Sequence, residues 1–256
     1  MVKKLPEDFV ILIPARYSSS RFPGKPLQEI DGIPMVVVVA KNCLKIAKNN
    51  EQVVVVTDDE RIQNTVKSFG INCVITSGNH STGTDRIAEI ASNSKFKNFI
   101  NVQGDEPMVT GLDVLKVVDL FLQFGGHVIA SGYCNFQQDA RLESLTIPKV
   151  VISEGNKMIY ASRMNVPANH KDLKAGRSNI STFARQVCIY AFSKKDLLAF
   201  ANHGKRTPLE NQEDIEILRF IELGMEIRLC EVDSTIAVDT PGDLELVRQK
   251  FAESKP

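Results

Sequence analysis

Short apolar runs alternate with longer segments of helical pattern through the first half of the chain. The strand-like runs, rich in Val, Ile and Phe, lie at 9–13, 53–57, 71–75 and 99–102. The segments between them that are long enough for a helix lie at 35–48, 59–69 and 84–92. Short apolar strands separated by helices predict an α/β fold, with a mostly parallel central sheet flanked by helices.

One of these segments carries conflicting signals. It opens with Met35 followed by four valines, and β-branched residues favour a strand. Lys41, Lys45 and Lys48 follow at helical spacing. Because this spacing continues over a length that exceeds a typical strand, the pattern predicts a helix over 35–48.

The second half of the chain is less regular. The pattern predicts strands at 128–132, 149–152, 187–192 and 226–232. The last clear helices are predicted at 210–223 and 241–251. Residues 153–186 are rich in polar side chains, glycine and proline, and we interpret them as an excursion from the sheet. Residues 1–256 are thus predicted to form a single domain, with a smaller irregular excursion at about 150–190.

Composition limits the classes of partner. The 31 Lys and Arg residues balance the 31 Asp and Glu residues, so the chain lacks the basic excess of nucleic-acid and membrane-surface proteins. The five cysteines are widely spaced, which predicts reduced core residues and not disulfides or zinc ligands. The first apolar run is too short to span a bilayer, which takes about 20 residues. We therefore expect a cytoplasmic protein that binds neither nucleic acid nor membrane.

A basic loop directly follows the first predicted strand. It contains small residues and prolines and carries Arg16, Arg21 and Lys25. Small residues let the backbone approach phosphate oxygens, and the cations neutralise them, so the loop predicts a polyphosphate site. The alternative is a solvated basic connector. The prolines argue against it, because they stiffen the loop and a connector needs no stiffness.

Two acidic motifs follow other predicted elements. Gln103-Gly104-Asp105-Glu106-Pro107 ends a strand, and Asp239-Thr240-Pro241-Gly242-Asp243 starts the last helix. Mg²⁺ prefers one or two carboxylates together with substrate phosphates, so Asp105 and Asp239 are candidate metal ligands. Taken singly, Asp105 could belong to a simple turn and Asp239 could be the N-cap of the helix.

A hydroxyl-rich turn precedes the third predicted helix. It contains Ser81, Gly83, Thr84 and Arg86, which could lie about a nucleobase, although simple helix capping explains the same residues. The sequence contains neither a P-loop nor a G-x-G-x-x-G motif, and its four histidines lack metal-ligand spacing.

A row of glutamates recurs along a predicted late helix. Glu210, Glu213 and Glu216 follow one another at intervals of three, a pattern that usually marks a solvated helix face. The row could instead border a polar substrate.

Together these motifs resemble one family. The pattern A-R-x-x-S-x-R-x-P-G-K-P-L, then G-T-D-R, Q-G-D-E-P and D-T-P-x-D-L occur in order, and the likeness runs from about residue 8 to about residue 250. The chain resembles the CMP-Kdo synthetases, the 3-deoxy-manno-octulosonate cytidylyltransferases. The resemblance implies a nucleotide-diphospho-sugar transferase type of fold, a homodimer, CTP as donor, Mg²⁺ as cofactor and an acidic eight-carbon sugar as acceptor. It also implies that the anomeric hydroxyl attacks the α-phosphate and that pyrophosphate leaves, in lipopolysaccharide biosynthesis.

The resemblance also implies roles for particular residues. The nucleotide-binding half spans about 8–130, and the excursion at about 150–190 serves the acceptor and dimerisation. The triphosphate would be held by Arg16, Arg21 and Lys25, the catalytic cations, and Mg²⁺ by Asp105 and Asp239. The nucleotide would be lined by Ser81, Gly83, Thr84 and Arg86, and the sugar acid approached by Gln103 and Arg163. Phosphoryl transfer depends on positioning and charge neutralisation, which these residue types provide.

The departures from the family pattern fall on the acceptor side. The family commonly has H-L-G-I-Y where this chain has Gln186-Val187-Cys188-Ile189-Tyr190, and L-E-Q-L-R where it has residues 215–219. The segment after Arg163 also lacks the usual I-P-W ending. Gln186 and Tyr190 are expected beside the acceptor. The changes predict an altered acceptor, and we expect 8-amino-3,8-dideoxy-manno-octulosonate, because Gln186 can accept from its ammonium and Glu213 or Glu216 can pair with it.

Other interpretations remain. Neutral drift at the changed positions would leave 3-deoxy-manno-octulosonate (Kdo) itself as the acceptor. Another ulosonic acid is a second alternative, although the two acidic motifs fit the octulosonate branch better. A non-catalytic nucleotide-binding regulatory protein is a third, but such a protein could lose Asp105 or Asp239 without penalty, and this chain has both.

Overall fold

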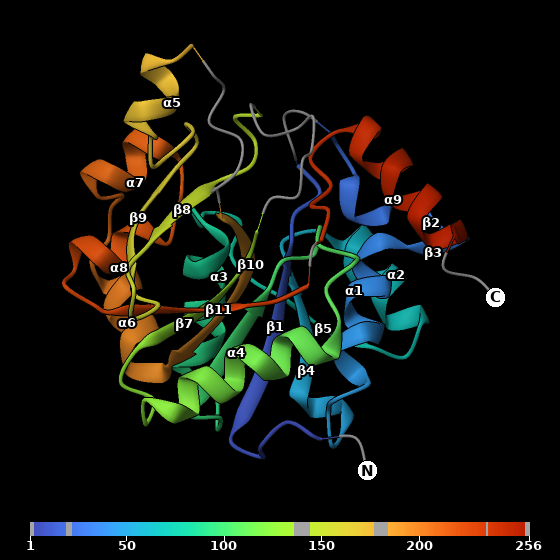
Figure 1. Cartoon of the computed structure of the whole chain (residues 1–256). Helices are drawn as coiled ribbons and strands as arrows, with labels where there is room; N and C mark the ends of the chain where they lie inside the picture. Colours follow the sequence, from blue (N-terminus) through green and yellow to red (C-terminus); the bar gives the residue numbers. More distant parts are fainter. Residues whose placement is uncertain (1–2, 19–21, 136–143, 177–183, 234, 254–256) are drawn as a thin grey trace.

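The fold is built on one mixed sheet of nine strands among the described residues (Figure 1). The computed structural model describes residues 3–18, 22–135, 144–176, 184–233 and 235–253. Its strands are β1 (Phe9–Ala15), β4 (Val53–Thr57), β5 (Asn72–Ile75), β6 (Asn98–Val102), β7 (Ile129–Asn135), β8 (Lys149–Ile152), β9 (Met158–Ser162), β10 (Ala184–Ser193) and β11 (Ile227–Glu231). The main path runs β11-β7-β10-β6-β1-β4-β5, and β8 and β9 branch from β10. Strand β10 is antiparallel to β6 and β7, whereas β1 is parallel to both β4 and β6. The predicted fold class is confirmed.

Helices bury both faces of this sheet. One face packs against α1 (Met35–Leu44), α2 (Glu60–Ser68) and α4 (Gly111–Gln123). The other packs against α3 (Gly83–Ser92), α6 (Lys194–Asn202) and α8 (Leu218–Glu222). Along β1, Phe9, Ile11 and Ile13 belong to the first core, and Val10 and Leu12 belong to the second. A strand buried on both sides must be apolar throughout, which explains the unbroken run in the sequence.

A third, smaller core brings the last helix beside the hairpin that follows the loop after β1. The hairpin of β2 (Glu29–Ile30) and β3 (Ile33–Pro34) packs against α9 (Pro241–Glu253) through Ile30, Leu244 and Val247. Arg248 on α9 donates to the carbonyl oxygen of Glu29 at 2.8 Å. The segment that precedes α9 therefore lies next to the loop after β1.

Most predicted elements are present, with one clear error. The valine-rich segment is the helix α1, as predicted, but the helix ends at Leu44 and not at residue 48. The predicted helix over 210–223 is wrong: the chain forms α7 (Pro208–Glu213) and α8, separated by Asp214 in the left-handed conformation, with φ +53°. The sequence also gave no prediction for α4, α6, β9, α5 (His170–Lys174), η1 (Lys25–Leu27) and η2 (Asn50–Gln52).

Two smaller observations bear on the class of protein. No helix within the described ranges is both long and apolar enough to cross a membrane. None of the five cysteines forms a disulfide, and Cys43, Cys73 and Cys134 are buried.

Candidate active site

The polar motifs converge at one edge of the sheet. Because β1, β4 and β6 are parallel, the residues that follow them lie at the same edge. Strand β10 runs the other way, and its Ile189 pairs with Val102 at the end of β6. The start of β10 therefore extends past β6 at this edge. Figure 1 shows α5 and α7 on one side of the edge and α9 on the other.

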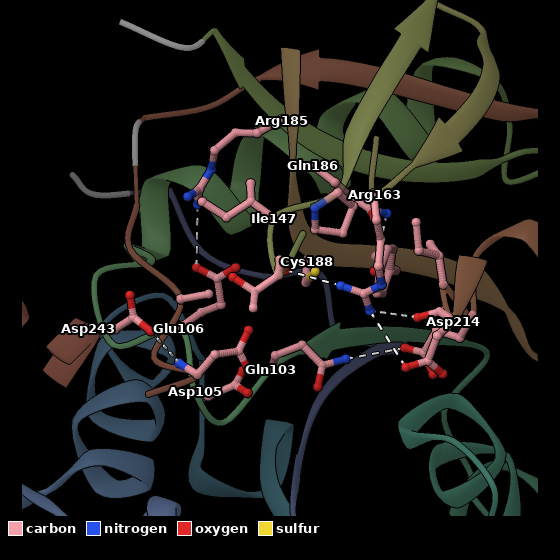
Figure 2. A pocket seen from close by; sticks show the side chains of 17 residues that line it. Gln103, Asp105, Glu106, Ile147, Arg163, Arg185, Gln186, Cys188, Asp214 and Asp243 are labelled. Atoms are coloured by element: carbon pink, nitrogen blue, oxygen red, sulfur yellow. Dashed lines mark hydrogen bonds and ion pairs between the residues drawn. The ribbon is translucent and has the colours of Figure 1, made fainter. Parts of the chain in front are cut away.

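Two cavities lie next to each other here. The first, which we call the loop cavity, measures about 330 Å³ and is lined by the loop after β1 together with Gly83 and Gly104. The second, which we call the acidic pocket, measures about 210 Å³ and is lined by the start of β10 and by residues 146–148 and 214–216 (Figure 2). Gln103 and Asp105 line both cavities, so a ligand in one can contact a ligand in the other.

Backbone contacts fix the loop cavity. Gly24 adopts φ +69° and donates to the carbonyl oxygen of Tyr17 at 2.9 Å. The guanidinium of Arg61 lies 3.3 Å from the centre of the Tyr17 ring. A Cβ at Gly104 would lie 2.9 Å from the carbonyl oxygen of Pro14, so the ends of β1 and β6 approach as closely as glycine allows.

Lys25 joins the two candidate metal ligands. Its ammonium lies 2.6 Å from Asp105 Oδ2 and 3.5 Å from Asp239 Oδ1, and its side chain is 11% exposed. Burial lowers the pKa of Lys25, but the two carboxylates outweigh burial and the net shift is upward. The nitrogen of Val238 donates to the carbonyl oxygen of Asp105 at 2.9 Å, so a backbone bond connects the two acidic segments.

The N-cap of the last helix is Thr240 and not Asp239. Thr240 Oγ1 accepts from the nitrogen of Asp243, and Asp243 Oδ2 accepts from the nitrogen of Thr240 at 2.9 Å, which is a capping box. The side chain of Asp239 contacts Lys25.

The donor set fits Mg²⁺ only in part. A single ammonium contacts both Asp105 and Asp239, so their oxygens can reach one cation together. Within the ranges that the structure describes, no cluster of three or more His, Cys, Asp or Glu side chains is arranged to hold a metal ion. Two carboxylates, with phosphate and water completing the shell, are what Mg²⁺ takes at nucleotide sites.

Arg16 directly follows β1, and Arg86 lies in the first turns of α3. Of these two arginines, Arg16 lines the loop cavity and Arg86 does not. The buried Nη2 of Arg16 has no hydrogen-bond partner among the described residues. Burial and the neighbouring Arg86 lower the pKa of Arg16. Arg86 is fully buried and bonded to Asp58 at 2.8 Å and to Thr76. Arg86 thus supports the wall behind Arg16, and the predicted Arg21 lies outside the described residues.

The turn before α3 divides between capping and the site. Thr82 and Asp85 form a capping box, as the capping interpretation proposed. Gly83 lines the loop cavity, and Thr84 Oγ1 is buried without a hydrogen-bond partner in the described part of the chain. Ser81 is exposed and lines a separate cavity of about 370 Å³ beside α6.

Glu216 connects the two cavities. One of its carboxylate oxygens accepts from Gln103 Nε2 at 3.3 Å, and the other accepts from the nitrogen of Thr84 at 3.2 Å. Burial raises the pKa of Glu216, against the opposing effect of the bond from Thr84. Figure 2 shows Gln103 between Asp105 on one side of the pocket and Asp214 on the other.

Arg163 holds two walls of the acidic pocket together. Its Nε donates to the carbonyl oxygen of Glu213, and its Nη2 donates to that of Asp214, both at 2.8 Å. Its Nη1 donates to the carbonyl oxygen of Leu145 at 2.9 Å. The Glu213 carboxylate accepts from the nitrogen of Arg163 at 2.9 Å, as well as from two hydroxyls, and Glu213 does not line the pocket. Glu213 therefore supports Arg163.

The changed residues of β10 lie in the acidic pocket. Gln186, Cys188 and Tyr190 line it, and Gln186 Nε2 donates to the Tyr190 hydroxyl at 3.2 Å. Gln186 and Tyr190 are both buried, and burial raises the pKa of Tyr190 well above its usual value.

The three late glutamates do not share one helix face, since Glu210 is fully buried and bonded to Arg219 at 2.6 Å.

Several residues of the pocket were missed from the sequence, among them Arg185, Glu106 and Asp214. Arg185 Nη2 donates to Thr235 at 2.5 Å and lies 4.0 Å from the carboxylate of Glu106. Burial raises the pKa of Glu106, and Arg185 opposes the shift. Asp214 contacts Arg163 and Arg206. Arg185 and Glu106 adjoin predicted residues, which is a usable signal, whereas Asp214 enters the pocket because of the unpredicted helix break.

Comparisons with known proteins agree with this arrangement, which is that of a nucleotide-binding α/β protein. A family model described as Cytidylyltransferase matches residues 10–227. A 3-deoxy-manno-octulosonate cytidylyltransferase of Geobacter metallireducens is 35% identical over 94% of this chain and 96% of its own length. The corresponding protein of Escherichia coli is 36% identical over 95% of this chain and 96% of its own.

A solved structure gives the same result. The CMP:2-keto-3-deoxy-manno-octonic acid synthetase complexed with CTP superposes with a TM-score of 0.84 at 33% identity, covering 96% of this chain and 99% of the other. The chain therefore belongs to the cytidylyltransferases and, within them, to the CMP-Kdo synthetase family.

Proposed function

We propose that this protein transfers CMP from CTP to the anomeric hydroxyl of a 3-deoxy-octulosonate, the reaction for which its relatives are named. The bond from the anomeric oxygen to the α-phosphorus forms while the bond from the α-phosphorus to the bridging oxygen breaks. Pyrophosphate leaves, and the hydroxyl proton goes to solvent. The observation that best supports this is the position of Asp105, paired with Lys25 and lining both cavities.

In this proposal the loop cavity takes the triphosphate. Arg16 supports it with a buried guanidinium nitrogen that has no hydrogen-bond partner in the described ranges, and Lys25 with an ammonium at the cavity wall. Arg21 would join them, as the loop motif implies. A buried donor without a partner is unfavourable until an anion accepts from it, so the cavity favours phosphate oxygens.

Asp105 and Asp239 would hold Mg²⁺, which neutralises charge on the phosphates during transfer. Gln103 and Glu216 then orient the acceptor at the boundary of the two cavities, since their side chains already bond each other there. Arg163 fixes the far wall through its backbone contacts. Catalysis by these residues consists of positioning and of excluding water from the reacting oxygens.

The test is release of pyrophosphate from CTP with purified protein, Mg²⁺ and Kdo. We expect release that depends on both the sugar and the metal. A non-catalytic nucleotide-binding protein would bind CTP in a titration and release no pyrophosphate with any ulosonic acid, which would contradict the proposal. A sialic-acid-like sugar as the better acceptor would favour the alternative substrate class.

A finer proposal concerns the acceptor: we infer that the protein prefers the 8-amino sugar to Kdo. Besides Asp105 and Asp239, which are assigned to Mg²⁺, the described residues that line the acidic pocket include four carboxylates and only two guanidiniums. A pocket for a sugar that is itself an anion has no need of this excess. An ammonium on the acceptor would be attracted by it, and Gln186, unlike a histidine, cannot acquire a positive charge.

Competing kinetics decide between the two acceptors. With CTP saturating, we expect a higher kcat/KM for 8-amino-3,8-dideoxy-manno-octulosonate than for Kdo, and a smaller difference in Gln186→His. Equal values, or a preference for Kdo, would contradict the inference and leave Kdo as the acceptor. The cytidylyltransferase proposal would be unaffected.

We also propose a homodimer. Three large apolar side chains near β8 and β9 are more than half exposed, namely Leu145, Ile159 and Met164. Exposed large apolar side chains that gather near one part of a fold are usual at interfaces. Sedimentation equilibrium of the wild type and of Ile159→Glu is the test, and a monomeric wild type would contradict the proposal.

A further inference from the structure

We propose that Lys25 and Mg²⁺ occupy the same position in turn, so that the lysine ammonium keeps the metal out until the nucleotide arrives. This inference rests on the proposed use of CTP and Mg²⁺. It adds an order of binding that the motifs do not contain.

The first step of the argument is the contact itself. The ammonium of Lys25 contacts a carboxylate oxygen of Asp105 at 2.6 Å and one of Asp239 at 3.5 Å. These are the two carboxylates assigned to the metal. A cation placed to bind both of them would have to stand where the ammonium stands.

The second step is burial. The side chains of Lys25, Asp105 and Asp239 are 11%, 31% and 22% exposed, so water screens this cluster poorly. Carboxylates brought together in such a place are unfavourable without a cation between them. Mg²⁺ can replace the lysine there because it supplies the positive charge that the ammonium provides.

The third step is the number of ligands. No group of three or more candidate ligand side chains exists among the residues described, and two carboxylates are too few to draw Mg²⁺ away from its water. Phosphate oxygens would supply the missing ligands. The same phosphates attract Lys25, which already lines the loop cavity. The triphosphate thus favours both the binding of Mg²⁺ to the two carboxylates and the departure of Lys25 from them.

The fourth step is that the backbone does not depend on the lysine side chain. The bond from Val238 to the carbonyl of Asp105 joins the two acidic segments, and the capping box of Thr240 and Asp243 fixes the start of α9. The backbone of Lys25 is held by the bond from Gln28 to its carbonyl oxygen, at 3.1 Å. Variants at this side chain should therefore keep the carboxylates in place.

The test measures Mn²⁺ binding to the nucleotide-free protein by the electron paramagnetic resonance of free Mn²⁺. The wild type should bind Mn²⁺ weakly alone and at least about tenfold more tightly with CTP, which supplies the missing ligands. Lys25→Met, which removes the charge and keeps an unbranched chain, should bind Mn²⁺ about tenfold more tightly than the wild type without CTP.

Three control variants make the result specific. Lys25→Arg keeps a cation and should bind Mn²⁺ as weakly as the wild type. Arg16→Met removes a cation of the same cavity whose charged neighbours are Arg86, Asp58, Glu216 and Asp85, and should weaken CTP binding only. In the double variant Lys25→Met with Asp105→Asn, the tight Mn²⁺ binding should disappear. Circular dichroism and thermal unfolding confirm that each variant is folded.

Several outcomes would overturn the inference. They are Mn²⁺ binding by Lys25→Met no tighter than by the wild type, equal tightening in Lys25→Arg, or tight binding that survives Asp105→Asn. Failure of the proposed function has a different signature, because no pyrophosphate would then be released from CTP with any ulosonic acid, while the effect of Lys25→Met on Mn²⁺ binding without nucleotide would still be measurable.

Discussion

The two cavities at the edge of the sheet are built in different ways. The loop cavity is made of short contiguous segments at the ends of parallel strands, and close backbone contacts at Gly24 and Gly104 fix their shape. The acidic pocket is made of side chains from six separate segments, and ion pairs and bonds to carbonyl oxygens hold it. We infer that the loop cavity is rigid and binds a constant ligand. We infer that the ligand of the acidic pocket, in contrast, can change when single side chains are substituted.

The largest effect is expected at Asp105, the carboxylate that lines both cavities. Asp105→Asn keeps the size of the side chain and removes a charge, so CTP binding should persist while kcat falls by about 10²–10³-fold. Calorimetry with CTP and a pyrophosphate release assay measure the two quantities. A kcat near that of the wild type would show that the metal assignment is wrong and that the cavities act independently.

A change confined to the acidic pocket should separate the two substrates. Arg163→Lys keeps the charge but loses most of the bonds to the carbonyl oxygens of Leu145, Glu213 and Asp214. We expect the KM for the sugar acid to rise about tenfold and the KM for CTP to stay unchanged.

Arg206→Lys is the matched control for this variant. Arg206 also contacts Asp214, at 2.5 Å, but does not line the pocket, so the KM for the sugar should not change. If Arg163→Lys raised the KM for CTP as much as that for the sugar, the two cavities would not be separate units.

The same contrast explains what the sequence could predict. The loop cavity could be predicted from the sequence because its cations and its carboxylate lie in contiguous motifs that directly follow apolar strands. The helix at Met35 was predicted correctly in type, although Lys45 and Lys48, which supported the prediction, lie beyond its end at Leu44. The acidic pocket depends on Asp214. The helical pattern of the sequence continues through this position, but the residue adopts the left-handed backbone conformation. Aspartate tolerates this conformation, so composition gives no warning.

Charged residues in motifs were also assigned too readily to ligands. Arg86 belongs to a motif, yet the structure buries it against Asp58 and Thr76. Glu213 is a second charged residue that bonds to a neighbour, because its side chain supports Arg163. Whether a charged side chain faces a cavity or a neighbour depends on contacts across more than ten residues, which local patterns do not contain.

The pH dependence of stability should differ between two neighbouring glutamates. Burial raises the pKa of Glu216 above its ordinary value of 4.5, so its contribution to the free energy of unfolding is full below pH 4.5 and is lost as the pH rises through the folded pKa. The stability of the wild type relative to Glu216→Gln should therefore fall as the pH rises from about 4.5. Urea unfolding at a series of pH values measures this difference.

Glu213 should show the opposite pH dependence of stability. Burial acts to raise its pKa, but hydrogen bonds from Arg163, Ser162 and Tyr160 outweigh burial, and the net shift is below 4.5. Its contribution is present above pH 4.5 and is lost as the pH falls through the folded pKa. The stability of the wild type relative to Glu213→Gln should rise with pH over that range, and the same slope for both variants would contradict the assignment.

The smallest effect is expected where the acidic segment meets the last helix. Thr240→Ala removes the N-cap hydroxyl of α9, and we expect the free energy of unfolding to fall by about 1 kcal/mol. Thr82→Ala on α3 removes an equivalent cap and should cost about the same. Because Asp243 still accepts from the nitrogen of Asp239, at 3.1 Å, the Asp239 carboxylate should remain beside Lys25. Binding of Mn²⁺ with CTP should then change by less than about twofold, since the loop cavity is fixed by its backbone and not by this cap. A larger loss of metal binding would mean that the rigidity of the loop cavity depends on α9, and the contrast between the two cavities would have to be redrawn.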